Sequence, residues 1–554
     1  MDSTAHLPEG HDSDSKQSRG WKFWLIFVSL CASVFLSALD LSSVGTALPV
    51  IVNELHGEDS FAWVSAVYTL TCTAILPLSG QLADIWGRRV ILLSAIFLFA
   101  LGSVICATAS SMNILIGGRA VQGMGSGGIQ SLVAIIIADM VTLKERGLFI
   151  SLTGAAYSIA TAVGPFIAGV FSQKVTWRWQ VRHHINLPLC GLAFSVVSLI
   201  RLRKPPVESI RKQLAVLDWI GNAAIMGSTV SCVLAVTWAG FSFPWASVQV
   251  LAPLICGVFG LVAALIYETW FATNPCVPIV IMSNRTSLSG YFGTFTHGMV
   301  SIIVFCGYSH VPLYFQACKL ASPLRSGLYF FPMAVMISPA AIIQGITISK
   351  TGNYRLVSVL GWVSMLVGIG LLMLATPSAN IGVVIVAQLV AAVGVGLLYC
   401  TQFSILAPLD PRLNSQALAF LLFLRSFSQT WGVAVGATII QNHLKHHLPV
   451  EFLARFAPKQ DIAYSAVPLL KSLSPSLRAE AQEAFSGSLR LLWIVSMALC
   501  GIGLLSVAFQ KNIPLHRLRD ERRGLESAPV TTENQVEGLD DEQHEKDEVV
   551  AKNY

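Results

Sequence analysis

Charged side chains are scarce in this chain of 554 residues: 12% are Asp, Glu, Lys or Arg, whereas 54% are hydrophobic. A soluble protein of this length usually carries about twice that charged fraction. The composition therefore argues against a soluble enzyme or binding domain. The net charge of +6 does not indicate a nucleic-acid partner, because the basic residues lie between long apolar segments.

Several functional signatures are missing as well. The eleven cysteines form no Cys-x-x-Cys pair, which indicates packing residues rather than a disulfide or metal set. No Gly-x4-Gly-Lys-Ser/Thr phosphate loop is present, and no nucleophile–base or metal-ligand spacing stands out. The first twenty residues lack the apolar core of a cleavable signal peptide. We therefore expect no enzyme activity, no cofactor and no bound metal.

Long apolar segments dominate the rest of the chain. Segments of about 18 residues or more are long enough to cross a bilayer. The sequence predicts fourteen such segments: 23–47, 61–83, 90–109, 112–138, 148–172, 184–200, 218–240, 248–270, 290–316, 326–348, 356–376, 380–406, 416–440 and 488–509. Lysine and arginine are enriched in alternate connections, which favours both termini in the cytosol. The polar ends, 1–22 and 510–554, are expected to be disordered.

The short connection GQLADIWGRR, from Gly80 to Arg89, combines charges and glycines between two membrane segments. Asp84 and Arg88 are four residues apart, so one helical turn would bring their side chains within hydrogen-bonding distance. Gly80 allows another helix to approach closely, and Gly87 can adopt a backbone conformation that other residues resist. An ordinary positive-inside hairpin loop would also explain the charges.

Asp40 and Arg119 are predicted inside the membrane. Asp40 should lie roughly 13 Å below the outer surface and Arg119 roughly 12 Å, by helix rise. A buried charge in a bilayer is costly unless it is paired or neutralised. The matching depths permit an ion pair between the first and fourth segments, although Asp40 as a helix-end aspartate is the alternative.

The fifth segment contains Gly154, Gly164, Pro165 and Gly169. Proline bends a membrane helix and glycines let a neighbour approach, so this segment is predicted to be a kinked packing helix. Proline kinks without a special role are common, and that interpretation stays open.

The second half of the chain echoes the first. The stretch GITISKTGNYR echoes this connection: Gly345 and Gly352 repeat the spacing of Gly80 and Gly87, Arg355 is retained as a basic residue, and Asp84 has no acidic counterpart. Gly394-x-Gly396 similarly resembles Gly123-x-Gly125. We expect parallel repeats, with the chain divided into a six-helix bundle at 23–200, a cytoplasmic loop and two inserted helices at 201–270, and a six-helix bundle at 271–509 that includes a long outer loop at 441–487.

Three further residues are candidates for a substrate cavity. Tyr314 and Gln316 could line it, although an interfacial aromatic belt explains them equally well. Arg425 could bind a carboxylate substrate, pair with Glu268 or hold a helix carbonyl. The histidines at 443, 446 and 447 are more readily explained as a solvated loop than as a metal site.

The motifs at 80–89, at Arg119-x2-Gln-Gly-x-Gly and at Gly154 to Gly169 together resemble those of the major facilitator superfamily, and the first segment (Leu39-Asp40, Ala47-Leu48-Pro49) is similar to that of its fourteen-helix drug:proton antiporters. The resemblance implies a major facilitator fold of two six-helix bundles plus two inserted helices. It also implies a cytoplasmic latch of Asp84, Arg88 and Arg89 with Asp139, a role for Arg119 in proton transfer, and antiport through the fifth segment.

The expected function is a proton-coupled efflux pump that exports amphipathic small molecules, with Asp40 alternating between ionised and neutral forms. Its expected partners are the substrate, protons and the lipid bilayer, in a monomer at the cell membrane. The alternatives are a siderophore-iron or vacuolar basic amino acid transporter, in the latter case at the vacuolar membrane, and a membrane sensor that no longer transports.

Overall fold

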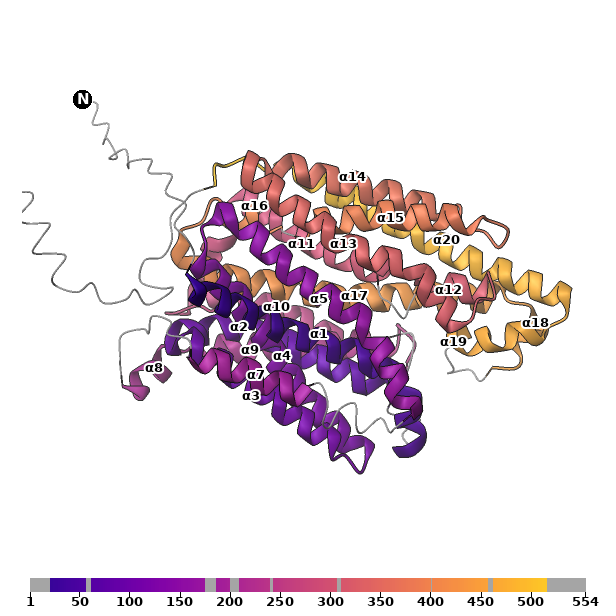
Figure 1. The fold of residues 1–554 in the computed structure, drawn as a ribbon, viewed down its shortest axis with the longest axis horizontal. Helices are drawn as coiled ribbons and strands as arrows, with labels where there is room; N and C mark the ends of the chain where they lie inside the picture. The colour runs from indigo at the N-terminus through magenta and orange to yellow at the C-terminus, as the bar shows by residue number, and fades with distance from the viewer. Residues whose placement is uncertain are drawn as a thin grey trace, which may run out of the picture.

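The computed structural model describes residues 20–55, 61–174, 186–199, 209–239, 243–305, 310–399, 401–456 and 462–515. Regular secondary structure within these residues is helical (Figure 1). The helices of the first half are α1 (Trp21–Leu55), α2 (Phe61–Trp86), α3 (Arg88–Ala107), α4 (Met112–Met140), α5 (Leu143–Lys174) and α7 (Asn186–Leu199). The short α8 (Ile210–Val216) precedes the pair α9 (Trp219–Trp238) and α10 (Val248–Trp270).

The second half begins with a 3-10 turn, η1 (Ile279–Met282). Its long helices are α11 (Arg285–Phe305), α13 (Pro323–Thr351), α14 (Tyr354–Leu372), α15 (Ile381–Leu397), α17 (Asn414–His447) and α20 (Pro475–Ser506). The shorter elements are α12 (His310–Ala317), α16 (Gln402–Leu406), η2 (Pro411–Leu413), α18 (Val450–Leu453), α19 (Ile462–Ala466), η3 (Val467–Ser472) and η4 (Val507–Phe509).

The two halves pack their helices in the same way. Helix α4 packs against α2 and α3, and α15 packs against α13 and α14. Helix α1 packs against α5, and α11 packs against α17. The halves meet where α2 contacts α17 and where α5 contacts α13, while the pair α9–α10 joins the assembly through α2 and α17. Figure 1 shows the first half below and the second half above, with their helix axes running in similar directions.

Glycines determine how closely the inner helices approach, and they also define the register of the repeat. A Cβ on Gly125 would lie 2.4 Å from the Phe99 nitrogen on α3, and one on Gly394 would lie 2.4 Å from the Met365 nitrogen on α14. The next pair behaves alike, because Gly127 faces α2 and Gly396 faces α13. Gly394-x-Gly396 therefore matches Gly125-x-Gly127 in space, two residues later than the sequence pattern suggests.

Eleven helices among the described residues are long and apolar enough to cross a membrane, so the predicted count of fourteen is not confirmed. The three remaining predicted segments correspond to α5, to the 14-residue α7 and to α11 followed by α12. The predicted outer loop 441–487 is largely helical, because α17 continues to His447 and α20 begins at Pro475.

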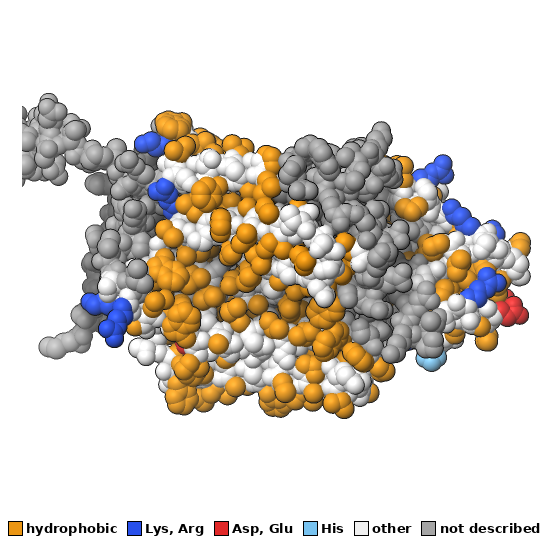
Figure 2. Space-filling view, turned by 90° about the horizontal axis from the view of Figure 1, so that it is seen from below, with side chains coloured by type: hydrophobic (Ala, Val, Ile, Leu, Met, Phe, Trp, Pro, Cys, Tyr) orange, Lys and Arg blue, Asp and Glu red, His pale blue; other side chains and the backbone are white. Residues whose placement is uncertain are grey.

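The outer surface is suited to lipid. Figure 2 shows hydrophobic side chains across the middle of one face and Lys and Arg side chains toward its two ends. On α10 a row of apolar residues points outward: Ile255, Val258, Phe259, Val262 and Ile266. Exposed apolar helix faces of this kind are stable when acyl chains rather than water cover them.

Candidate functional site

Asp40 and Arg119 form an ion pair in the interior of the first half. Arg119 Nη1 lies 2.5 Å from Asp40 Oδ2, and both side chains are 2% exposed. Gln122, one turn along α4, connects the two: its Oε1 accepts from Arg119 Nη1 at 2.6 Å, and its Nε2 donates to Asp40 Oδ1 at 2.8 Å. The two residues predicted to lie at similar depths in the membrane are thus in direct contact between α1 and α4.

The surroundings of Arg119 show what holds it in place. Its Nε donates to the carbonyl of Val64 on α2 at 3.2 Å, and its guanidinium carbon lies 4.2 Å from the centre of the Tyr68 ring. Its Nη2 has no hydrogen-bond partner among the described residues. Because Arg119 keeps its charge at any physiological pH, the Asp40 carboxylate is the group whose protonation would change the balance of charge here.

Arg88 joins three helices at the end of the molecule where α2 and α3 are connected. Its Nη1 lies 2.8 Å from Asp84 Oδ1, and its Nε lies 2.8 Å from Asp139 Oδ2 on α4. Its Nη2 donates to Ser415 Oγ on α17 at 2.6 Å. The expected grouping of Asp84, Arg88 and Asp139 is present, and it also reaches the second half of the protein.

The glycines of this motif lie where the backbone needs them. Gly87 has φ 87°, a value that other residues rarely adopt, and it starts α3 immediately after α2 ends. A Cβ on Gly80 would lie 2.9 Å from Ala419 Cβ and 3.2 Å from the Ser415 carbonyl oxygen, so α2 and α17 are in close contact there. Arg89 points elsewhere: it donates to the carbonyl of Ser198 on α7.

The fifth-segment motif lies on α5, and its two described glycines face different neighbours. A Cβ on Gly164 would collide with the Ser42 side chain on α1. A Cβ on Gly154 would lie 3.0 Å from the ring of Tyr399, which belongs to the second half. The surroundings of Pro165 and Gly169 lie outside those that the structure describes.

Arg425 holds a backbone carbonyl in the turn that follows α15, which resembles the third of the possibilities left open by the sequence. Its Nη2 donates to the Tyr399 carbonyl at 2.6 Å, and its guanidinium lies 4.9 Å from the Tyr399 ring centre. Glu268 does not pair with it within the described residues; one carboxyl oxygen instead accepts from the Val277 amide at 3.2 Å. Arg425 thereby fixes the aromatic ring that Gly154 contacts.

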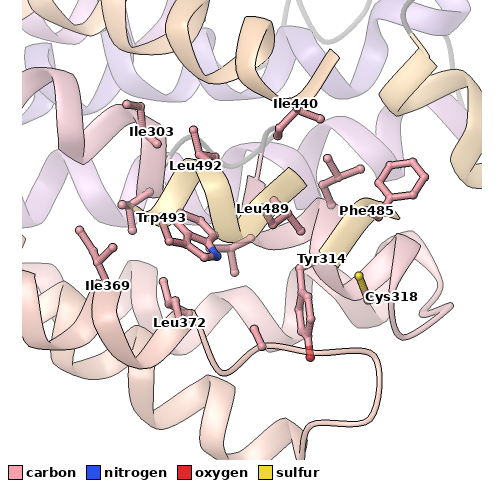
Figure 3. Close-up of a cluster of buried hydrophobic side chains, with 14 of the residues drawn as sticks. Ile303, Tyr314, Cys318, Ile369, Leu372, Ile440, Phe485, Leu489, Leu492 and Trp493 are labelled. Atoms are coloured by element: carbon pink, nitrogen blue, oxygen red, sulfur yellow. The ribbon is translucent and has the colours of Figure 1, made fainter. Parts of the chain in front are cut away.

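Tyr314 lies in the hydrophobic core of the second half, next to Phe485 and Cys318 (Figure 3). Its hydroxyl donates to the Thr376 carbonyl at 2.9 Å, and its side chain is almost fully buried. Gln316 is half-buried, and its Nε2 lies 3.4 Å from Ser326 Oγ. A substrate contact at either residue stays a prediction, and the hydrogen bond of Tyr314 provides a structural explanation for that residue.

Three residues of this site were not expected from the sequence. Gln122 was noted only as part of a motif, although its spacing of three from Arg119 was a usable signal. Ser415 gave no signal, because its contact with Arg88 depends on how the halves meet. Arg146 looked like a loop charge, but it is 2% exposed and its Nη2 donates to the Ala138 carbonyl at 2.9 Å.

Two other features lie away from Asp40. A pocket of about 450 Å³ is lined by residues from both halves and the segment after α20, including Lys144, Lys350 and Asn512. The rings of His443 and His447 stack 3.8 Å apart, and no group of three or more His, Cys, Asp or Glu suited to a metal occurs in the part of the chain that the structure describes.

Comparisons with known proteins agree with this architecture. The chain is 35% identical to "Efflux pump FUS6" of Gibberella fujikuroi, over 93% of this chain and 94% of that protein. It is also 35% identical to "Acurin A biosynthesis cluster MFS-type transporter" of Aspergillus aculeatus, over 93% of each chain.

Solved structures share the fold at low sequence identity. The human organic anion transporter MFSD10 matches with a TM-score of 0.55 and 13% identity, over 87% of this chain and 100% of that chain. The proton:xylose symporter XylE matches with a TM-score of 0.53 and 14% identity, over 90% of this chain and 98% of that chain. The family model of the Major Facilitator Superfamily matches residues 30–436. The chain is thus a multi-pass membrane transporter that belongs to the major facilitator superfamily.

Proposed function

We propose that this transporter exports amphipathic small molecules, of the secondary-metabolite type, in exchange for protons. The observation that carries the proposal is the buried group of Asp40, Arg119 and Gln122 between α1 and α4. The relatives named as efflux pumps and as a biosynthesis-cluster transporter support export and the substrate class.

Protonation of Asp40 is the proposed coupling step. In the ionised form the carboxylate accepts hydrogen bonds from Arg119 and Gln122. A proton on Asp40 removes the negative charge and leaves the buried Arg119 cation without its counter-ion, which is unfavourable in a low-dielectric interior. The helices then rearrange until another group compensates the charge of Arg119. Substrate binding and protonation of Asp40 exclude each other, so the two alternate during transport.

The proposed conformational change is a rocking of the bundle at 23–200 against the bundle at 271–509, with 201–270 as an inserted unit. Arg88 and its partners Asp84, Asp139 and Ser415 close the predicted cytoplasmic end in one state. Gly154 with Tyr399 and Gly164 with Ser42 are the close contacts across which α5 moves. Pro165 and Gly169 complete the proposed antiport motif, and Tyr314, Gln316 and Arg425 remain proposed substrate contacts.

The test is proton-gradient-driven efflux in reconstituted vesicles. We expect Asp40→Asn to abolish gradient-driven flux, because an amide cannot take up and release the proton. The variant also leaves the buried Arg119 cation without its counter-ion, so its thermal unfolding is measured beside the flux. The matched control is Glu483→Gln, which removes an exposed carboxylate on α20. Undiminished flux in Asp40→Asn would refute coupling at this residue.

The proposal includes a monomeric state and location at the plasma membrane. A pump that removes its substrate from the cell must work across the membrane that bounds the cell. A fluorescently tagged chain should mark the cell periphery. A signal confined to the vacuolar membrane would favour loading of the vacuole instead.

A further inference from the structure

Two acidic residues lie together at the start of α9, away from Asp40: Glu268 is buried and Asp218 is half-buried. Asp218 caps α9: its Oδ1 accepts from the Gly221 amide at 2.8 Å. Glu268, near the end of α10, accepts from the Val277 amide through Oε2 at 3.2 Å. Each carboxyl group is therefore anchored to a backbone N–H by one oxygen.

The other two oxygens converge on one place. An atom at the Cβ position of Gly221 would lie 2.4 Å from both Asp218 Oδ2 and Glu268 Oε1, so these oxygens are no more than twice that distance apart. Both atoms are buried, and neither has a hydrogen-bond partner among the described residues. Glu268 is 2% exposed, so its free oxygen is directed into the protein and not toward water.

Two ionised carboxylates do not share such a place without compensation. None of the ion pairs among the described residues includes Asp218 or Glu268. The neutral thiol of Cys276 acts on Glu268 and the neutral hydroxyl of Tyr267 on Asp218, and α2 presents the neutral amide of Gln81, so none of these groups supplies a positive charge. A proton held between the two carboxyl groups removes one negative charge and supplies the missing donor.

We propose that Asp218 and Glu268 share one proton, forming a protonation site in the inserted helix pair that is separate from Asp40. One carboxyl O–H donates to the free oxygen of the other, and release of the proton to solvent leaves two carboxylates that repel each other. The site is connected to the first half, because Asn222 Nδ2 donates to Gln81 Oε1 at 2.7 Å and Gln81 adjoins Gly80. Its protonation state therefore bears on the packing of α9 against α2.

The test uses the full-length chain in lipid nanodiscs and dicyclohexylcarbodiimide, which reacts with protonated carboxyl groups shielded from water. We expect labelling of Asp218 or Glu268, never both in one molecule, that decreases as pH is raised. The exposed Glu483 should stay unlabelled. Absence of labelling at both residues from about pH 6 to about pH 9, a range that spans the values documented for buried carboxyl groups, would overturn the proposal.

Two variants separate a shared proton from a carboxyl group that is protonated by burial alone. Glu268→Gln and Asp218→Asn each supply an amide N–H to the remaining carboxylate, so labelling of that residue should fall by about tenfold, the ratio for a change of one pKa unit. If Glu268 is labelled equally in Asp218→Asn, burial alone protonates it and the proton is not shared. An Asp40→Asn background should leave the labelling unchanged, so this result is independent of the proposed transport mechanism.

A bound cation could also compensate two carboxylates at one place. The thermal unfolding of the wild-type chain should not change when Na⁺ or Ca²⁺ replaces the same ionic strength of choline chloride. A cation-specific rise in unfolding temperature that Glu268→Gln removes would overturn the shared proton in favour of a cation site.

Discussion

The turn after α2 and the turn after α13 each contain a glycine with positive φ, Gly87 and Gly352, but their chemistry differs. Gly80 brings α2 against α17, and Gly345 brings α13 against α5, where its Cβ would lie 2.6 Å from the Gly147 carbonyl carbon. The first turn adds Arg88 with Asp84, Asp139 and Ser415, whereas Lys350 at the second is exposed and takes part in none of the ion pairs among the described residues. The comparison shows that the repeat preserves close packing in both halves and places the ionic contact in one.

The same contrast holds inside the bundles. Arg119 lies six residues before Gly125, and Gln388 lies six residues before Gly394 in the matching position of α15. Gln388 is fully buried, and neither polar atom of its side chain has a partner in the described part of the chain. The second half therefore has a neutral amide where the first half has the cation that pairs with Asp40, and the proposed coupling mechanism assigns this difference to transport.

The largest effect on stability and transport is expected when Arg119 is replaced by glutamine, the residue at the matching position of α15. Arg119→Gln leaves the Asp40 carboxylate buried without its cation, which costs about 3–5 kcal/mol of unfolding free energy. Gradient-driven efflux should disappear. Thermal unfolding in detergent and vesicle flux measure the two effects.

A double variant shows whether the loss is one of charge or of shape. Asp40→Asn combined with Arg119→Gln should recover most of the stability, because no buried charge remains, but it should recover no proton-driven flux. Recovery of flux would mean that neither charge couples transport to protons.

The next effect concerns the ionic contact between the halves. Arg88→Gln removes the attraction to Asp84 and Asp139 and the bond to Ser415, so the predicted cytoplasmic end should open more often and efflux should fall by about tenfold, equivalent to about 1.4 kcal/mol. A cysteine introduced at Ala419, which faces Gly80 at the same interface, should react faster with a water-soluble maleimide in an otherwise cysteine-free chain when Arg88 is absent.

Arg89→Gln is the matched control for this experiment. Arg89 contacts the Ser198 carbonyl on α7 and has no described contact with the second half. We expect Arg89→Gln to leave the cytoplasmic end closed. If it opens that end as much as Arg88→Gln does, the bond between Arg88 and Ser415 is not what keeps the end closed.

The sequence predicted the parts of the site that depend on spacing along one helix or on depth in the membrane. Asp84 with Arg88 was expected from their spacing, and a pair of Asp40 with Arg119 was permitted by their matching depths. The bond from Arg88 to Ser415 and the ring of Tyr399 against Gly154 were not expected, because contacts between halves depend on how whole bundles dock. The buried state of Arg146 was missed because its neighbours Lys144 and Glu145 made the stretch look like a solvated loop.

The end of α17 could not be predicted from the polarity of its residues. Residues 441–447 look polar, yet they continue α17 because the side chains of His443 and His447 stack and His443 Nδ1 lies 2.9 Å from Ser488 Oγ. The register of the repeat was misjudged by two residues, because glycines alternate between facing α2 and facing α3 and the sequence alone does not show which face is which.

An effect on stability of similar size should separate the two close approaches at Gly345 and Gly80. Gly345→Ala places a methyl group against the backbone of Gly147, which cannot move aside, so we expect a loss of about 1–3 kcal/mol in unfolding free energy. Gly80→Ala meets the Ala419 methyl and the Ser415 carbonyl oxygen at longer distances and should cost less. Chemical denaturation of both variants tests the order; Gly352→Ala is unsuitable as a control because its φ is 68°.

The smallest effect isolates the single bond by which Arg88 crosses between halves. Ser415→Ala keeps both carboxylate partners of Arg88 and removes only the acceptor of its Nη2 group. A hydrogen bond to a charged group contributes about 1.5–3 kcal/mol, but here water at the end of the molecule can replace the hydroxyl, so a reduction in efflux of only about threefold is expected. Thermal stability should hardly change, since the carboxylates still compensate the charge. An equal loss in Ser426→Ala, which removes the hydroxyl contact of Thr73 at another point of the α2–α17 interface, would show that packing between the halves matters there and that this arginine bond has no special part in closing the end.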